Sequence, residues 1–294
     1  MTATAPRRVR AHRRRRELGR YASHRRGRVL GRYAVLTAVA VVVLFPVYTA
    51  VVVAMQPLAA FTDLGVLVPR HLTLRPFIEA FGNGHLGRYL VNSFVVSTAI
   101  TIGQVTTSIL AAYAFAFLRF RGRSVLFVVF LATLMIPTEV TIVANFETVQ
   151  RWHWTDTYAA LVVPFLAFGF GTFLLRQAFL GIPRELSDAA LVDGYGHFGF
   201  LTKVAVPLAR PSIAALTVFS FLGAWNQYLW PLLVTNNDRY RTVQIGLKQL
   251  AGTNSVTFNV VMAGTLIAAL PIVVLLVFFE RHLVRGLTAG AVKG

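Results

Sequence analysis

Few side chains in this 294-residue chain have the type and spacing that catalysis or metal binding requires. The chain contains no cysteine, which excludes a disulfide framework, a zinc site built on thiolates and a cysteine nucleophile. Its histidines fall in tails, loops and the ends of apolar stretches, so they cannot form a metal cluster within those stretches. None of its lysines follows Gly or precedes Ser or Thr, so the G-x-x-x-x-G-K-[ST] loop that binds nucleotide phosphates is missing. We therefore expect no catalytic residue, no metal and no cofactor in this chain.

The composition indicates an integral membrane protein. Apolar residues make up 56% of the chain and charged residues only 14%, against about 25% charged residues in an ordinary soluble domain. A helix crosses the hydrocarbon core with roughly 20 mostly apolar residues, and because lipid offers no partner for backbone N–H and C=O groups, each spanning stretch must be helical. The sequence thus predicts an all-α fold with six transmembrane helices, over Tyr33–Met55, Tyr89–Leu118, Val125–Phe146, Tyr158–Leu180, Leu208–Val234 and Phe258–Phe279.

The distribution of Lys and Arg predicts that both termini are cytoplasmic. An even number of spans places both termini on one side, and 22 of the 29 Lys and Arg residues fall on that side, 12 of them in residues 1–32. We expect residues 1–32 to be a disordered basic tail that sets topology and touches anionic lipid headgroups. A nucleic-acid patch is the alternative interpretation, but the tail has no aromatic interleaving and precedes a membrane span, so we expect no nucleic acid as a partner.

The loop between the fourth and fifth stretches, about residues 182–207, carries the signals of a short helix. Pro183 suits the first helical position, Glu185 falls in the first turn, where the helix dipole favours an acid, and Gly194 suits the C′ position that ends a helix. An i, i+3, i+4 spacing places small or apolar side chains on one face: Leu186, Ala189 and Ala190. Interfacial helices on lipid favour Lys, Arg and large apolar residues instead. This loop therefore predicts a docking face for a protein partner.

The same loop resembles a motif of bacterial ABC-importer permeases, E-A-A-x(3)-G-x(9)-I-x-L-P. Here Asp188-Ala189-Ala190, three residues, Gly194, nine residues and Val204-Ala205-Val206-Pro207 reproduce its spacing, with Asp in place of Glu and Val in place of Ile and Leu. Further stretches resemble the carbohydrate and glycerol-3-phosphate class of these permeases: Ala112–Phe117 followed by Arg119–Arg123, Met135–Pro137, Phe173–Gln177, Gly223–Asn226 and Gly286–Gly294.

The resemblance implies the rest of the assembly. It implies a MetI-like permease core over residues 33–285, a cytoplasmic C-terminal tail over 286–294 and a multi-pass place in the bacterial plasma (inner) membrane. The implied partners are a second homologous permease, two ATPase subunits that hold the ATP and Mg, an extracytoplasmic solute-binding protein and membrane lipid. The residues implied to couple to the ATPase are Glu185, Asp188, Ala189, Ala190, Gly194 and Pro207. The residues implied for a contact of the C-terminal tail are Thr288, Gly290 and Lys293.

Polar residues within the predicted spans are candidates for the translocation pathway. Glu139 is the only acid well inside a span, where an exposed charge costs about 3 kcal/mol on insertion scales, so it faces protein or water. It either stabilises a helix that restarts after Pro137 or lines the cavity. The fifth span contains a polar and aromatic run, which is Trp225, Asn226, Gln227 and Tyr228. These residues either act as interhelical glue, that is, they hydrogen-bond one helix to another, or line the cavity, or form a gate. For the tryptophans, an aromatic belt at the membrane interface is a further alternative. Asn92 and Ser93 favour glue.

The transported solute is the least determined part. The class resemblance implies glycerol-3-phosphate, a glycerophosphodiester or a related sugar, with a maltose-type di- or oligosaccharide as the alternative. No Lys or Arg lies at the centre of a span to hold a phosphate. A secondary transporter is a weaker rival, because it would need ionisable residues at the midplane and often shows inverted repeats. A membrane-embedded enzyme has no paired carboxylates or nucleophile–base set to support it.

Overall fold

The computed structural model describes residues 7–57, 71–83, 85–252 and 258–288, and it describes side chains between residues 31 and 280 except those of Asn83 and Thr138. All regular secondary structure in these ranges is helical, as predicted. The helices are α1 Arg7–Ala54, α2 Arg75–Asn83, α3 Leu86–Phe117, α4 Arg123–Ala132, η3 Thr133–Met135, α5 Thr138–Arg151, α6 Tyr158–Val162, η4 Val163–Phe165, α7 Gly169–Leu180, α8 Arg184–Val192, α9 His197–Phe200, the π-helix η5 Leu201–Ala205, α10 Val206–Leu208, α11 Arg210–Trp225, α12 Leu229–Val234, α13 Val243–Gly252 and α14 Phe258–Thr288.

Within the described residues, three stretches are long and apolar enough to cross a membrane alone: Gly31–Ala54 in α1, Leu86–Phe117 in α3 and Phe258–Glu280 in α14. Three further candidates are helix pairs with a sharp bend between their halves. The bends measure 98° between α4–η3 and α5, 45° between α6–η4 and α7, and 80° between α9–α10 and α11. Counting each bent pair as one span gives six, the number predicted from the sequence.

Two of the breaks show how the sequence ends a helix. The expected break at Pro137 is confirmed, because η3 ends at Met135 and α5 begins at Thr138. The fifth predicted span, Leu208–Val234, is wrong as a continuous helix, since α11 ends at Trp225 and α12 starts only at Leu229. The Asn226 side-chain amide donates a hydrogen bond to the Leu222 carbonyl at 2.9 Å and so satisfies a carbonyl at the end of α11.

The chain divides into two compact units, Met1–Leu72 and Thr73–Gly294. In the first, α1 begins at Arg7, so the backbone of residues 7–32 is helical where the sequence predicts disorder. Arg, Leu and Ala are strong helix formers, and no proline interrupts residues 7–45. From Tyr33 to Tyr48 the apolar side chains of α1 are exposed around the helix, as in a span that faces lipid, and Val52, Val53 and Ala54 at its end are buried.

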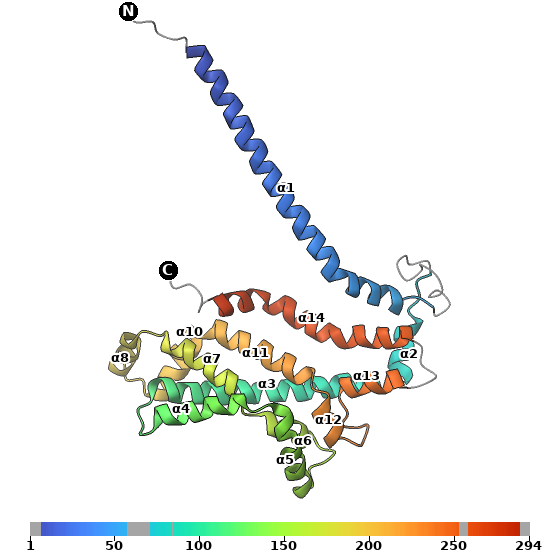
Figure 1. Cartoon of the computed structure of the whole chain (residues 1–294). Helices are drawn as coiled ribbons and strands as arrows, with labels where there is room; N and C mark the ends of the chain where they lie inside the picture. Colours follow the sequence, from blue (N-terminus) through green and yellow to red (C-terminus); the bar gives the residue numbers. More distant parts are fainter. Residues whose placement is uncertain (1–6, 58–70, 84, 253–257, 289–294) are drawn as a thin grey trace, which may run out of the picture. The chain divides into compact units, whose positions relative to one another are not determined.

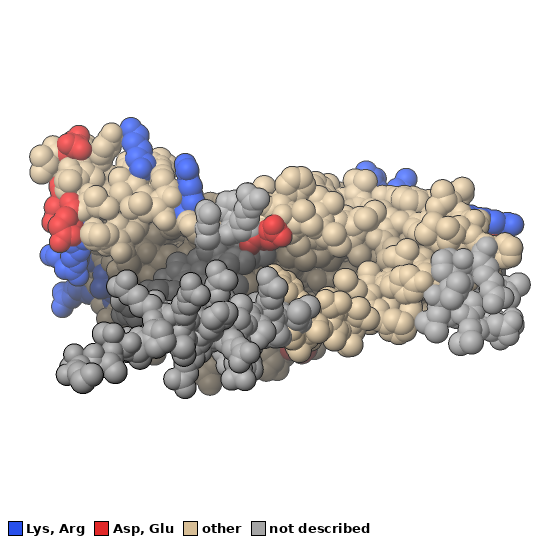
Figure 2. Space-filling model, turned by 90° about the horizontal axis from the view of Figure 1, so that it is seen from above, with Lys and Arg blue, Asp and Glu red and all other residues tan. Residues whose placement is uncertain are grey.

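The second unit is built around α3. This helix packs against α7 and α11, α11 packs against α14, and α14 packs in turn against α2 and α13 (Figure 1). On the face in Figure 2, Lys and Arg gather with Asp and Glu at the end that holds α8, and Lys and Arg lie towards the opposite end. The described surface between them is mostly of other residues, with an acidic side chain among them. A middle with few charges between charged ends is typical of a membrane-spanning unit.

The helix α3 carries a polar stripe whose side chains donate hydrogen bonds to the backbone carbonyls at the break between η4 and α7. The Gln104 amide donates to the Phe165 carbonyl at 2.9 Å, the Thr107 hydroxyl donates to the Leu166 carbonyl at 2.7 Å, and the Ser108 hydroxyl donates to the Phe168 carbonyl at 3.4 Å. These carbonyls lie at or next to the link that interrupts the helix, where lipid would leave them without a partner. The stripe therefore allows a bent span to exist inside the membrane.

Two adjacent threonines of α3 test this contribution. We expect Thr107→Val to lower the stability of the purified protein by about 1 kcal/mol, because the Leu166 carbonyl loses its hydroxyl donor. Thr106→Val is the matched control, since Thr106 is exposed and no hydrogen bond from its side chain is found in the described structure. The measurement is the thermal midpoint of both variants in the same detergent. Equal midpoints for the two variants would contradict the role of the stripe.

Candidate functional site

The helix α8 is defined by its flanking residues. Pro183 is the N-cap, with φ −57° and ψ 138°, and α8 begins at Arg184, one residue after the first helical position that the sequence suggests. Glu185 lies in the first turn and is exposed, as expected for an acid at the positive end of the helix dipole. Thus the first turn of α8 places an acidic side chain on the outside of the molecule.

Gly194 ends α8 as the sequence predicts. Its φ is +80°, a left-handed conformation that favours glycine at the C′ position. The Gly194 N–H donates to the Leu191 carbonyl at 3.0 Å, and the Tyr195 N–H donates to the Ala190 carbonyl at 2.8 Å. This is the Schellman arrangement, which satisfies the last carbonyls of the helix and turns the chain back towards α9.

Buried apolar residues hold α8 against the rest of the unit. Ala190 is 5% exposed and belongs to a core cluster with Tyr113 of α3, Phe179 of α7 and Phe200 of α9. Phe117, packed against the same cluster, meets the Phe200 ring edge-on at a centroid distance of 5.1 Å. The position of α8 is therefore fixed by the C-terminal ends of α3 and α7.

The structure corrects the predicted docking face of α8. Leu186, Ala189 and Ala190 do not form one outward face, because Ala190 packs within the chain while the other two are exposed. The packing of Ala190 turns a different apolar set outward. Together with Leu186 and Ala189, the exposed residues are Leu191 at 61%, Val192 at 88% and Phe198 at 75%. We call Leu186, Ala189, Leu191, Val192 and Phe198 the outer face of the loop.

The second half of the motif forms an irregular helical segment. The π-helix η5 comes directly before α10, in which Pro207 lies in the first two positions. A proline lacks the N–H that would bond four residues back, and its ring clashes with that carbonyl, so a wider turn accommodates it. The 80° bend to α11 follows at Ala209. Pro207 therefore lies at the joint between the loop and the next span.

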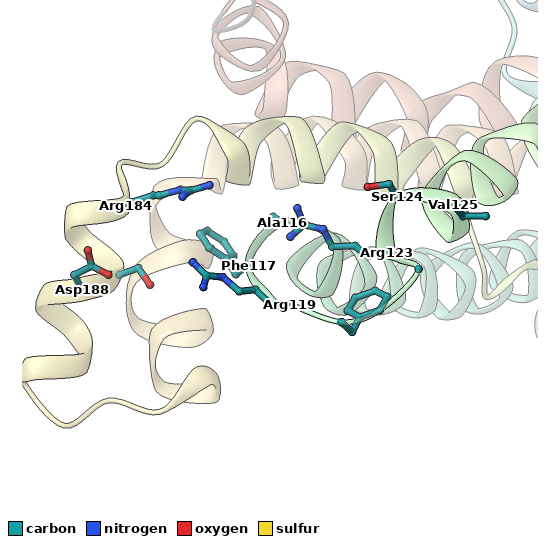
Figure 3. Close-up of a pocket in the computed structure, with 11 residues that line it drawn as sticks. Ala116, Phe117, Arg119, Arg123, Ser124, Val125, Arg184 and Asp188 are labelled. Carbon is teal, nitrogen blue, oxygen red and sulfur yellow. The ribbon is translucent and has the colours of Figure 1, made fainter.

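Asp188 lies beside a pocket that the sequence does not indicate. The pocket has a volume of about 490 Å³ and lies between the end of α3, the start of α4 and the start of α8 (Figure 3). Its lining includes Asp188 and three arginines, Arg119, Arg123 and Arg184. The arginines serve only to assign topology when the sequence is considered alone, because their residue types do not reveal that three segments bring them together.

The candidate pathway residues fall in different environments. Glu139 is exposed in the first turn of α5, the place that the helix-end interpretation requires. Trp225 is 1% exposed and stacks on Phe221 at 5.6 Å between ring centroids. Asn226 and Tyr228 are exposed, and Gln227 is half-buried. The amide of Asn226 bonds to its own helix, and no bond that joins two helices is found for it in the described part of the chain.

The remaining sequence interpretations have clear outcomes. Trp225 is buried, and so is Trp230, whose indole N–H donates to the Ala160 carbonyl at 2.9 Å, so neither belongs to an aromatic belt on the surface of this chain. The interpretation of Asn92 and Ser93 as glue is confirmed. The Asn92 amide donates to the carbonyls of Arg239 and Arg241 at 2.8 and 2.9 Å, and the Val243 N–H donates to the Ser93 hydroxyl at 2.7 Å.

The structure describes little of the predicted C-terminal contact residues. Thr288 is the last residue of α14, and its side chain is outside the described part of the structure. Gly290 and Lys293 lie outside the described residues altogether. Among the residues that are described, no group of three His, Cys, Asp or Glu side chains is placed to hold a metal ion.

A unit of bent helical spans with a short loop helix before the fifth span fits a transport permease. The chain belongs to the family of binding-protein-dependent transport system inner membrane components, whose family model matches residues 104–289. It is thus a non-catalytic, multi-pass permease subunit of an ABC importer in the bacterial inner membrane.

Curated relatives specify the class of permease to which the chain is similar. The chain is 44% identical over 204 residues to the sn-glycerol-3-phosphate transport system permease protein UgpE of Agrobacterium fabrum, which covers 69% of this chain and 72% of that protein. It is 40% identical over 230 residues to UgpE of Rhizobium meliloti, covering 75% and 82%. The resemblance to the glycerol-3-phosphate class is thereby confirmed.

Solved structures show the same fold. A chain of a bacterial ABC transporter involved in the import of the acidic polysaccharide alginate superimposes with a TM-score of 0.76 at 20% identity, over 95% of this chain and 99% of that chain. A second alginate transporter structure, in complex with an alginate pentasaccharide-bound periplasmic protein, matches with a TM-score of 0.60 at 17% identity, over 84% and 91%. The predicted MetI-like permease fold is therefore confirmed.

Two glycines that flank Tyr195 test the end of α8. We expect Gly194→Ala to speed hydrogen exchange of the amides of residues 193–195 about tenfold, because a left-handed backbone costs a residue with a Cβ roughly 1–2 kcal/mol. Gly196→Ala is the control, since Gly196 has a φ of −73° and open space around the Cβ position. Hydrogen-exchange mass spectrometry measures both, and equal exchange in the two variants would contradict the requirement for glycine at position 194.

Proposed function

We propose that this chain forms half of the translocation pathway of an ATP-driven importer and couples it to an ATPase subunit through α8. The observation that carries the proposal is the outer face of the loop. It presents Leu191 and Val192 of α8 and Phe198 of α9 outward, while the buried Ala190 holds α8 against the rest of the unit. Exposed large apolar residues close together in one loop favour a protein contact, and the family provides an ATPase as the protein to contact.

The coupling residues have distinct roles in this proposal. Glu185 and Asp188 are exposed acids on α8 that meet the partner, and Ala189 permits close approach of its backbone. Gly194 fixes the return of the chain after the helix, and Pro207 lies at the bend into α11. When ATP closes the ATPase dimer, α8 moves with it, and the bent span made by α9–α10 and α11 transmits the motion. The tail residues Thr288, Gly290 and Lys293 form a second contact with the ATPase.

The assembly follows from the family. A second homologous permease completes the pathway, two ATPase subunits supply ATP hydrolysis with Mg, and an extracytoplasmic solute-binding protein delivers the solute. The excess of Lys and Arg on the side of α8 supports cytoplasmic termini. The basic segment within residues 1–32 lies along anionic lipid headgroups there.

The substrate proposal comes from the relatives. We infer that the solute is sn-glycerol-3-phosphate, a glycerophosphodiester or a related sugar, with a maltose-type oligosaccharide as the alternative. Glu139, Trp225, Asn226, Gln227 and Tyr228 are the proposed pathway residues. A carboxylate repels a phosphate, so Glu139 would bind a hydroxyl or a cationic group of the solute rather than its phosphate.

A charge on the outer face tests the coupling proposal. We expect Val192→Asp to weaken co-purification of the ATPase subunit at least about tenfold, because a central contact residue contributes on the order of 2 kcal/mol and Val192 is 88% exposed in the described structure. Ile78→Asp is the control, since Ile78 is 70% exposed on α2, far along the chain from the loop. Both variants should reach the membrane in normal amounts. Retention of the ATPase by Val192→Asp would overturn the assignment of the outer face.

Transport measurements test the function and the pathway together. Cells that express the complete system should take up labelled sn-glycerol-3-phosphate, and vanadate should stop the uptake while a protonophore should not. We expect Glu139→Gln at normal membrane abundance to lower uptake several-fold. Protonophore sensitivity without vanadate sensitivity would indicate a secondary transporter, uptake of maltose alone would correct the solute, and full uptake by Glu139→Gln would remove Glu139 from the pathway.

A further inference from the structure

The arginines of the pocket beside α8 have no role in the proposed transport cycle. Its three basic side chains come from three places in the chain: Arg119 after α3, Arg123 at the start of α4 and Arg184 at the start of α8. Arg119 and Arg184 both extend into the space between their segments (Figure 3). Asp188 is the one acid among the lining residues, so the pocket carries a surplus of two positive charges.

The arginines are not used in ion pairs by the part of the chain that is described. The ion pairs found there are Arg75–Glu79, Glu147–Arg151 and Asp238–Arg241. Arg123 donates one hydrogen bond to the Leu118 carbonyl at 3.1 Å, which positions it at the pocket wall. No hydrogen bond from the side chains of Arg119 and Arg184 is found in the described structure, so their guanidinium groups are open to a ligand from outside the chain.

The start of α4 adds backbone donors to the same pocket. Its N-cap, Gly122, has a φ of +80° and gives no side-chain cap, and the first turn of α4 contains no acid. Ser124 and Val125 line the pocket in that first turn, where backbone N–H groups have no partner within the helix. The positive end of the helix dipole reinforces the arginines. An anion with several oxygens fits this set of donors.

The surroundings of the pocket indicate what carries the anion. Next to it, α4 exposes a run of apolar side chains, with Val125 at 68%, Leu126 at 52% and Val128 at 65% exposed. This helix is part of a candidate membrane span. A ligand that satisfies both surfaces has a phosphate attached to long apolar chains, and basic pockets between transmembrane helices hold such headgroups.

We propose that Arg119, Arg123 and Arg184 bind the phosphate of an anionic phospholipid, with its acyl chains against the exposed face of α4. The serine hydroxyls of Ser124 and Ser187 can donate to the same phosphate, and the Asp188 carboxylate bounds the pocket on the side of α8. Because this lipid site includes the start of α8, it links the lipid headgroup to the position of that helix.

Native mass spectrometry of the full-length chain tests the proposal. We expect Arg119→Gln/Arg184→Gln to bind phosphatidylglycerol roughly thirtyfold more weakly than the unaltered chain, the factor that two lost charge contacts give. Neither arginine makes an ion pair in the described structure, so the variant should keep its fold and its thermal midpoint. Arg121→Gln/Arg151→Gln is the charge-matched control, because neither of those residues lines the pocket.

The outcomes separate the sources of the anion. Retention of phosphatidylglycerol but not phosphatidylcholine, with loss only in the pocket variant, supports the site. Equal loss in the control variant would show general electrostatics and overturn it. Displacement of the lipid by millimolar inorganic phosphate would assign the pocket to a free phosphate instead. Unchanged lipid binding with loss of the ATPase subunit would place an acidic partner surface in the pocket and equally overturn the lipid proposal.

Discussion

The structure depends on one requirement, that backbone groups released by broken helices find hydrogen-bond partners where water is scarce. Three of the six candidate spans are bent between their halves. At the bend before α7, three polar side chains within about one turn of α3 donate to the carbonyls at the link, those of Gln104, Thr107 and Ser108. Without these donors an interrupted helix in the membrane would leave several carbonyls without partners, each a loss of the order of a hydrogen bond.

The same helix provides the contacts at both of its ends. Towards the end with Asn92 and Ser93, it bonds the backbone of residues 239–243, which precedes α13. Towards the end with Tyr113 and Phe117, it provides the apolar seat of α8 and α9. A displacement of α8 therefore acts on α3 and α7 through packed rings rather than through a free loop, and close-packed interiors transmit such displacements.

Much of the fold could be predicted from the sequence because the signals were local. Apolar length marked the spans, Pro137 marked a break, and Gly194 marked the end of α8 through a backbone conformation that favours glycine. The end of α11 could not be predicted, because residues 225–234 remain apolar enough to continue a span. The helix ends with the C-cap Asn226, whose backbone N–H and side-chain amide both donate to the Leu222 carbonyl, and polarity alone does not distinguish a residue that bonds its own helix from one that joins two helices.

Only those features of the site that depend on residue spacing within one helix could be predicted from the sequence. The spacing of α8 indicated an apolar face but not which of its residues faces the chain. That choice depends on Tyr113, Phe179 and Phe200, which are distant in sequence. The arginine pocket was outside the reach of sequence for the same reason, since Arg119 and Arg184 are 65 positions apart and only the packing of α8 against α3 brings both to one opening.

Ala189 and Ala190, the two alanines of the motif, are therefore subject to different packing constraints. Ala190 is small because it lies in the seat formed by the rings of α3, α7 and α9, where a longer side chain would push α8 away from the unit. Ala189 is exposed, so nothing within the described chain limits its size. A small residue at position 189 would let another backbone approach α8 closely from outside. The chain alone thus explains one alanine of the pair, and the proposed contact with the ATPase subunit explains the other.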